Sequence, residues 1–277
     1  MITIKINDKE YTYNNFDDVI SLVYNHITYI DCSNNRLLVL PQLPNSLQIL
    51  YCWGNQLTTL AQLPNLLQQL DCDNNELTTL PQLPNSLQYL DCGNNQLTTL
   101  PQLPNSLQKL DCHNNQLTTL PQLSNSLKTL ICYDNQLTTL PQLPNSLQHL
   151  DCDNNQLTII PQLSNSLQEL YCEYNQLTTL PQLPNSLQIL ICHYNQLTTL
   201  PQLPNSLQKI DCSHNLLRLK YTEGKLKYNI KNKKYNNDKQ IVNDIQCSYL
   251  DSSYHPKNRF CKDKLLFSFD DLFDDDF

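Results

Sequence analysis

The sequence predicts a mainly β repeat solenoid, in which each repeat contributes one short strand to a long parallel sheet. Ten of the twelve cysteines recur every 20 residues, from Cys32 to Cys212. A fixed period of this length is typical of units that cannot bury an apolar face alone and therefore stack on their neighbours. A second observation supports this: the stretch NQLTTLPQLPNSLQ occurs four times, beginning at Asn95, Asn135, Asn175 and Asn195.

Each repeat is expected to contain one short strand that ends near its cysteine. Leu90 and Cys92 are two residues apart, so in an extended segment both side chains point to one face, while Asp91 and Gly93 point to the other. In parallel register the apolar faces of successive repeats form one continuous core. The regular spacing of the ten cysteines therefore indicates buried structural thiols rather than disulfide partners or reactive groups.

The rest of the repeat is expected to return the chain without a helix. An asparagine stands three residues after each cysteine, from Asn35 to Asn215, where the chain must turn away from the strand. Its amide can donate to and accept from backbone groups of adjoining coils. The following LTTLPQLPNS contains two prolines, which remove amide donors and disfavour helix. We therefore expect an extended or polyproline-like convex side, with helix only in the caps.

The repeat unit, L-x-x-L-x-C-x-x-N-x-L-x-x-L-P-x-L-P-x-S, resembles the leucine-rich repeat, and ten such units fill residues 27–217. The L-P-x-L-P form is similar to the 20-residue repeats of secreted bacterial effectors, and the chain also resembles uncharacterised repeat proteins of giant DNA viruses. The resemblance implies a curved parallel sheet whose concave face binds partners. About 60 residues follow the last repeat, too few for the ubiquitin-ligase domain that some of those effectors carry.

The segments outside the repeats are expected to form small caps and a tail. Residues 1–26 predict a β-hairpin, because apolar and polar residues alternate from Ile2 to Ile6, followed by a short helix over NNFDDVISLVYNH. Residues 218–236 predict a second hairpin that closes the far end. Residues 237–277 predict a linker and an acidic, Phe-rich tail. FSFDDLFDDDF is typical of disordered segments that fold on a partner, and the alternative is a tail whose Phe side chains pack back on the last coils.

The side chains that vary between repeats are mainly those that the outer face of the sheet would display. Rigid aromatic rings among charges are typical of interface hot spots, although Tyr and Ile also favour strands and tolerate exposure. We predict that a partner binds this face through the following residues: Tyr51, Trp53, Asp71, Asp73, Asp91, Asp111, His113, Tyr133, Asp151, Asp153, Tyr171, Glu173, Tyr174, Ile191, His193 and Tyr194.

Charge and composition narrow the choice of partner and compartment. The repeats, residues 27–217, contain 4 basic and 12 acidic residues, which favours a protein partner with a basic surface and disfavours nucleic acid. The sequence contains no signal-peptide pattern and no apolar run of membrane-spanning length, so no membrane association is expected. Ten reduced thiols fit a cytoplasmic location, in the cell that makes the protein or in a host cell. We expect a monomer.

Neither a metal site nor a catalytic centre is expected. Asp71, Asp73 and Asp91 could approach one another across adjacent strands, but an open sheet lacks the cage of oxygens that Ca²⁺ prefers. The sequence has no phosphate loop, nucleophile elbow, zinc-hydrolase helix or dinucleotide fingerprint. The sequence therefore favours a non-catalytic protein-interaction module without a cofactor. Two alternatives stay open: an adaptor that recruits a second partner through the acidic tail, and a structural repeat array without a specific ligand.

Overall fold

The computed structural model describes residues 1–19, 24–217, 221–222 and 225–226. The predicted linker and acidic tail, residues 237–277, lie outside the described residues. Among the helices of the described segments, none has the length and apolar character needed to cross a membrane.

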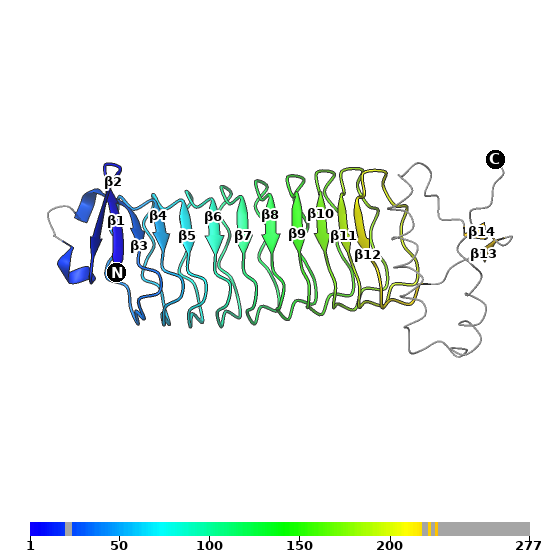
Figure 1. Ribbon diagram of the computed structural model, residues 1–277, viewed down its shortest axis with the longest axis horizontal. Helices are drawn as coiled ribbons and strands as arrows, with labels where there is room; N and C mark the ends of the chain where they lie inside the picture. Colours follow the sequence, from blue (N-terminus) through cyan, green and yellow to red (C-terminus); the bar gives the residue numbers. More distant parts are fainter. Residues whose placement is uncertain (20–23, 218–220, 223–224, 227–277) are drawn as a thin grey trace.

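A long ladder of short parallel strands forms the body of the protein (Figure 1). Within the described residues, nine successive parallel pairings connect ten strands, and each strand pairs with the one 20 residues further on. The prediction of a mainly β solenoid with a parallel sheet is confirmed. The strands are β3 (Ile27–Asp31), β4 (Ile49–Tyr51), β5 (Gln69–Asp71), β6 (Tyr89–Asp91), β7 (Lys109–Asp111), β8 (Thr129–Ile131), β9 (His149–Asp151), β10 (Glu169–Tyr171), β11 (Ile189–Ile191) and β12 (Lys209–Asp211).

The core is a single stack of leucines and cysteines that runs beneath the sheet. The central leucine of a strand and the cysteine that follows it, such as Leu90 and Cys92, are fully buried. All ten regularly spaced cysteines, which we call the cysteine column, are buried, and none of them forms a disulfide. The Sγ of Cys72 lies 3.3 Å from the carbonyl oxygen of Asp91 in the next coil, so the thiol donates a weak hydrogen bond along the stack. The predicted structural role of these thiols is confirmed.

The repeated asparagines connect neighbouring coils as the sequence predicts. The Nδ2 of Asn115 donates to the carbonyl oxygens of Cys92 at 3.0 Å and of Cys112 at 3.2 Å. Its Oδ1 accepts from the backbone nitrogen of Leu97 at 2.9 Å. One buried side chain therefore satisfies backbone groups of two coils where the chain leaves the strand.

The return path of each coil contains neither helix nor strand over residues 32–217, apart from β4 to β12. A tight turn ends the path, as where the backbone nitrogen of Leu107 donates to the carbonyl oxygen of Pro104 at 3.1 Å. The serine of this turn connects its coil to the preceding one, because the Oγ of Ser106 donates to the carbonyl oxygen of Leu87 at 2.6 Å. The proline-rich segment is therefore held by turns and by contacts between coils rather than by regular structure.

A hairpin extends the sheet at its N-terminal end (Figure 1). Strands β1 (Ile2–Ile6) and β2 (Lys9–Tyr13) pair antiparallel, and β1 also pairs antiparallel with β3. Ile2 and Ile4 are buried in the common core. The first coil therefore has a strand beside it instead of an open sheet edge.

Where a short helix is predicted after this hairpin, the described residues form two 3₁₀ turns, η1 (Phe16–Asp18) and η2 (Tyr24–His26). Asn15 caps η1 by accepting from the backbone nitrogen of Asp18 at 3.0 Å, and the chain is already extended at Val19, with ψ 110°. A β-branched residue has a weaker helix propensity, which favours this early end. Residues 20–23, which would have completed the apolar face, lie outside the described residues.

At the other end the long sheet stops at β12, and among the described residues no strand pairs with its outer edge. Strands β13 (Tyr221–Thr222) and β14 (Lys225–Leu226) pair antiparallel in a two-stranded sheet of their own. They lie within the segment, 218–236, where a second hairpin is predicted. Closure of the last coil by that hairpin stays a prediction.

Candidate protein-binding face

The outer side of the ladder presents the side chains that differ between coils. We call it the strand face, and define it by four positions of each coil: three residues before, one before, one after and two after the cysteine. Because parallel pairing aligns equivalent residues, Asp71, Asp91 and Asp111 occur at directly paired positions on three neighbouring strands. All the candidate binding residues belong to these positions.

The candidates differ in how much surface they offer. Trp53, Tyr174 and Tyr194 are exposed by 39%, 50% and 43%, whereas Ile191 and Asp111 are exposed by only 6% and 7%. Most of the others are half-buried. The strand face is therefore not uniformly open, and its accessible large side chains are mainly aromatic.

The residue two after each cysteine adopts a left-handed backbone conformation in all ten coils of the described chain, with φ between 45° and 66°. Asn, Asp or Gly, which tolerate this conformation, occupy the first seven of these positions, and bulky rings occupy the last three, Tyr174, Tyr194 and His214. A bulky residue in this region costs about 1–3 kcal/mol. Some interaction must therefore offset the strain in the last three coils.

Those three rings stack on one another along the ladder. The ring centroids of Tyr174 and Tyr194 are 4.6 Å apart, and those of Tyr194 and His214 are 4.1 Å apart, with 10° between the planes in both pairs. His193 lies edge-on to both tyrosines, at 5.2 and 5.3 Å. We call these four residues the aromatic stack. Aromatic pairs contribute about 0.5–1.5 kcal/mol each beyond their buried area, which is comparable to the backbone strain.

A second pair of rings lies further towards the N-terminus. The rings of His113 and Tyr133 are stacked, with centroids 4.7 Å apart. Gly93 leaves the space that the imidazole fills, because a Cβ at Gly93 would lie 2.3 Å from the Cε1 of His113. A larger residue at position 93 would therefore displace the histidine and disturb its stacking.

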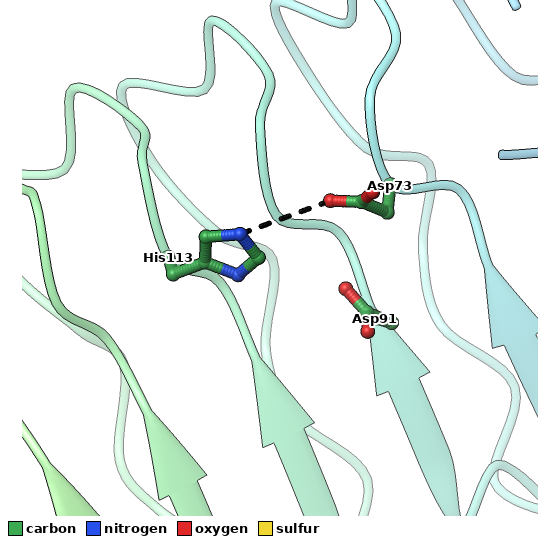
Figure 2. Close-up of side chains that lie close together, drawn as sticks. All are labelled: Asp73, Asp91 and His113. Atoms are coloured by element: carbon green, nitrogen blue, oxygen red, sulfur yellow. Dashed lines mark ion pairs between the residues drawn. The ribbon is translucent and has the colours of Figure 1, made fainter. Parts of the chain in front are cut away.

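His113 also lies close to two carboxylates, those of Asp73 and Asp91, and this combination of side chains could ligate a metal ion (Figure 2). One ligand atom from each of Asp73, Asp91 and His113 lies within 4.8 Å of the others. The Nε2 of His113 lies 4.0 Å from the Oδ1 of Asp73, and its Nδ1 lies 2.7 Å from the Oδ1 of Asp111. This hydrogen bond to Asp111 raises the pKa of His113. Burial, with repulsion from Asp111, raises the pKa of Asp91 to about 6.

This cluster is already satisfied by a neutral donor. The Nδ2 of Asn94 lies 2.8 Å from both the Oδ1 of Asp73 and the Nε2 of His113. A divalent cation would have to displace that amide, and among the described residues it would find a group of three ligands within 4.8 Å of one another, fewer than Ca²⁺ prefers. The absence of a metal site stays a prediction, and the local chemistry does not require an ion.

A hollow lies between the two groups of rings. Tyr133, Asp134, Asp153, Asn154, Glu173 and Tyr174 line a space of about 330 Å³, which we call the acidic hollow. The Oδ1 of Asp153 accepts from the backbone nitrogen of Glu173 at 2.9 Å. Burial and a hydrogen bond with the side chain of Glu173 hold the pKa of Asp153 well above its usual range. The acidic hollow therefore places the carboxyl group of Asp153 beside that of Glu173 in a partly buried setting that disfavours the charged form of Asp153.

A third aromatic region lies near the N-terminal end of the ladder. The ring of Tyr51 lies edge-on to that of Tyr29, with centroids 5.6 Å apart. The hydroxyl of Tyr51 also donates to the Oε1 of Gln69 at 3.0 Å. Trp53 stays exposed on the same coil.

Sequence reasoning missed several residues of the strand face. Most of them lie two residues after the cysteine. The sequence signal there is a column of Asn, Asp and Gly in the first seven coils that changes to aromatic rings in the last three. The others lie three residues before the cysteine, at a position that also varies between coils. The missed residues are Tyr29, Gln69, Asn94, Asp134, His149, Asn154 and His214.

Comparison with known families agrees with the repeat and its geometry. Residues 85–125 match the family described as Leucine Rich repeats (2 copies), and residues 146–165 match the family Leucine Rich Repeat. The protein is a leucine-rich-repeat protein with repeats similar to those of bacterial effectors. No curated protein matches the sequence.

Among solved structures, the chain is similar to YopM from Yersinia enterocolitica WA-314, with 34% identity, a TM-score of 0.59, and coverage of 69% of this chain and 47% of YopM. It is also similar to YopM from Yersinia pestis, described as a leucine-rich effector protein, with 34% identity, a TM-score of 0.57, and coverage of 67% and 65%. The functional domain of InlJ from Listeria monocytogenes, which includes a cysteine ladder, gives 26% identity, a TM-score of 0.50, and coverage of 71% and 50%. The matched region spans about half to two thirds of these chains.

Proposed function

We propose that the protein is a non-catalytic interaction module that binds a protein partner on its strand face. The aromatic stack carries this proposal, since Tyr174 and Tyr194 adopt a strained conformation and yet stay 50% and 43% exposed. Rings that served only to stabilise the fold would be expected to bury more of their surface. Exposed, mutually supported rings lose little conformational entropy on binding and are common in interface hot spots.

The charge of the face favours a partner with a basic surface. Carboxylates from five coils, those of Asp73, Asp91, Asp134, Asp153 and Glu173, lie on the same face as the rings. Complementary charge would speed encounter and orient the partner, and the rings would then supply most of the contact energy. We propose that a monomer acts in this way without a cofactor. The likeness to effector repeats supports a cytoplasmic setting, in the producing cell or in a host cell.

An affinity capture with matched variants tests the proposal. The binding variant carries Trp53→Ala, Tyr171→Ala and Tyr194→Ala on the strand face. The control variant carries Leu66→Ser and Ile159→Thr, which remove two side chains on the return path that are 54% and 57% exposed and restore the usual residue of the repeat. Circular dichroism first checks that both variants are folded.

We expect wild type and the control variant to retain the same partner from cell lysate, and the binding variant to lose it. If the return-path variant loses the partner and the strand-face variant keeps it, the binding surface is assigned to the wrong side. Equal capture by all three proteins would also contradict the proposal.

A further inference from the structure

We propose that the acidic hollow binds the guanidinium group of an arginine side chain that the protein partner presents. This inference names one chemical group within the proposed protein interaction and rests on that function. It depends on three features of the described residues: two aromatic walls, an acidic floor between them, and a space of side-chain size.

The walls are two tyrosines that belong to the sixth and eighth coils. Tyr133 is supported by the stacked ring of His113 at 4.7 Å, and Tyr174 by the stacked ring of Tyr194 at 4.6 Å. The seventh coil lies between them and lines the hollow with the shorter side chains of Asp153 and Asn154 instead of a ring. Adjacent coils are about 4.8 Å apart, so the two walls are separated by about 10 Å, which is enough for one planar group in contact with a ring.

The floor presents acceptors with few donors of its own. The amide of Asn154 is directed to the Oδ1 of Asp134. The Oε2 of Glu173 is buried and has no hydrogen-bond donor among the described groups. A cationic donor in the hollow would supply a hydrogen bond to the carboxylate of Glu173 and reduce its repulsion with Asp153, which lines the same hollow. The hollow is thus built as an acceptor site that its own chain does not fill.

The chemistry favours arginine over other cations. A guanidinium is planar, stacks on aromatic faces and offers five donors in a fixed arrangement, so it can contact a ring and two carboxylates at once. A volume of about 330 Å³ is at the lower end of ligand pockets and suits a single side chain. A bare divalent cation would gain nothing from the aromatic walls.

The test uses two small ligands that differ only in charge and donors. N-acetyl-arginine methylamide and its citrulline analogue are titrated into the full chain, and binding is followed by the NMR signals of labelled tyrosine rings. We expect the arginine ligand to shift the signals of Tyr133 and Tyr174, and the citrulline ligand to bind at least about tenfold more weakly. Equal binding of the two ligands would overturn the proposal, and this comparison needs no variant.

Two variants with matched controls locate the site. Glu173→Gln should weaken arginine binding by about tenfold, whereas Glu169→Gln, the same change on the same coil but outside the hollow, should leave it unchanged. Tyr174→Asn removes one wall and restores the residue usual at that backbone position, and His214→Asn is its control. If Glu173→Gln and Glu169→Gln behave alike, or if CaCl₂ shifts the same rings at a lower concentration than the arginine ligand, the assignment is wrong.

The outcomes separate this inference from the proposed function. If the captured partner is lost by the strand-face variant but kept by Glu173→Gln, the strand face binds a protein and the arginine assignment fails. Alternatively, arginine binds the hollow selectively, and the strand-face variant still captures every partner that wild type captures. The arginine site is then supported, and the proposal that the strand face binds a protein partner fails.

Discussion

Replacing Asn115 with alanine should destabilise the protein by about 2–4 kcal/mol. The change removes the acceptor of the Leu97 backbone nitrogen, at 2.9 Å, and leaves a buried donor unsatisfied, which costs about 1–3 kcal/mol. It also removes donations to the carbonyl oxygens of Cys92, Cys112 and His113. The first two still accept from Asn95 and Asn135, at 3.2 and 3.0 Å, so their loss adds less.

The neighbouring Asn114 provides the control. It is exposed, its side chain donates to the Oδ1 of Asn94, and its φ of 48° suits glycine. Asn114→Gly should therefore change the free energy of unfolding by no more than about 0.5 kcal/mol. Urea denaturation followed by circular dichroism measures both variants. Equal effects of the two changes, or a loss below about 0.5 kcal/mol for Asn115→Ala, would refute the structural role of this asparagine.

Three further predictions concern buried acids, buried thiols and strained rings. Burial raises the pKa of Asp91 and of Asp151 to about 6, so the folded chain holds these protons more tightly than the unfolded chain. The free energy of unfolding should then rise by about 1–3 kcal/mol, after allowance for partial exposure, as pH falls from about 7.5 to about 4.5. Asp91→Asn should reduce this pH-dependent change. Greater stability of the wild-type protein at the higher pH would contradict the prediction. The ten buried thiols of the cysteine column should react with a thiol reagent only after unfolding, in a chain with Cys247→Ser and Cys261→Ser, because burial excludes the reagent and raises the pKa of the nine thiols from Cys32 to Cys192. Rapid reaction in the native state would exclude the buried column. Tyr174→Asn should leave thermal stability within about 1 kcal/mol of wild type or raise it, because relief of strain offsets the lost stacking; a large loss would show that the ring is part of the scaffold.

The scaffold could be predicted because each coil repeats the same physical problem. The alternation of Leu90 and Cys92 defines the buried face, the spacing of the cysteines defines the register, and Asn115 occupies a position where backbone groups of two coils need partners. Each feature depends on residues close in sequence or 20 apart, so period and polarity are sufficient to predict it.

The candidate site could be predicted only in outline. Alternation indicates which side chains face outward, but not that Ile191 would be 6% exposed, because that depends on the neighbouring side chains. The stacking of Tyr194 on His214 depends on the left-handed backbone of their column. In the sequence, Gly93 is one more residue at a variable position. Its role depends on the imidazole of His113, which occupies the space that a side chain at position 93 would need. The short η1 turn likewise reflects local β-branching that the apolar periodicity of the segment concealed.

The proposed use of the strand face is tested most directly by photo-cross-linking at single sites. A photoreactive phenylalanine analogue is introduced at position 194, in the aromatic stack, or at position 182, where exposed Gln182 lies on the return path of an adjoining coil. After irradiation with the captured partner, a cross-linked product is expected from position 194 and not from position 182. Cross-linking from position 182 without any from position 194 would contradict binding through the strand face.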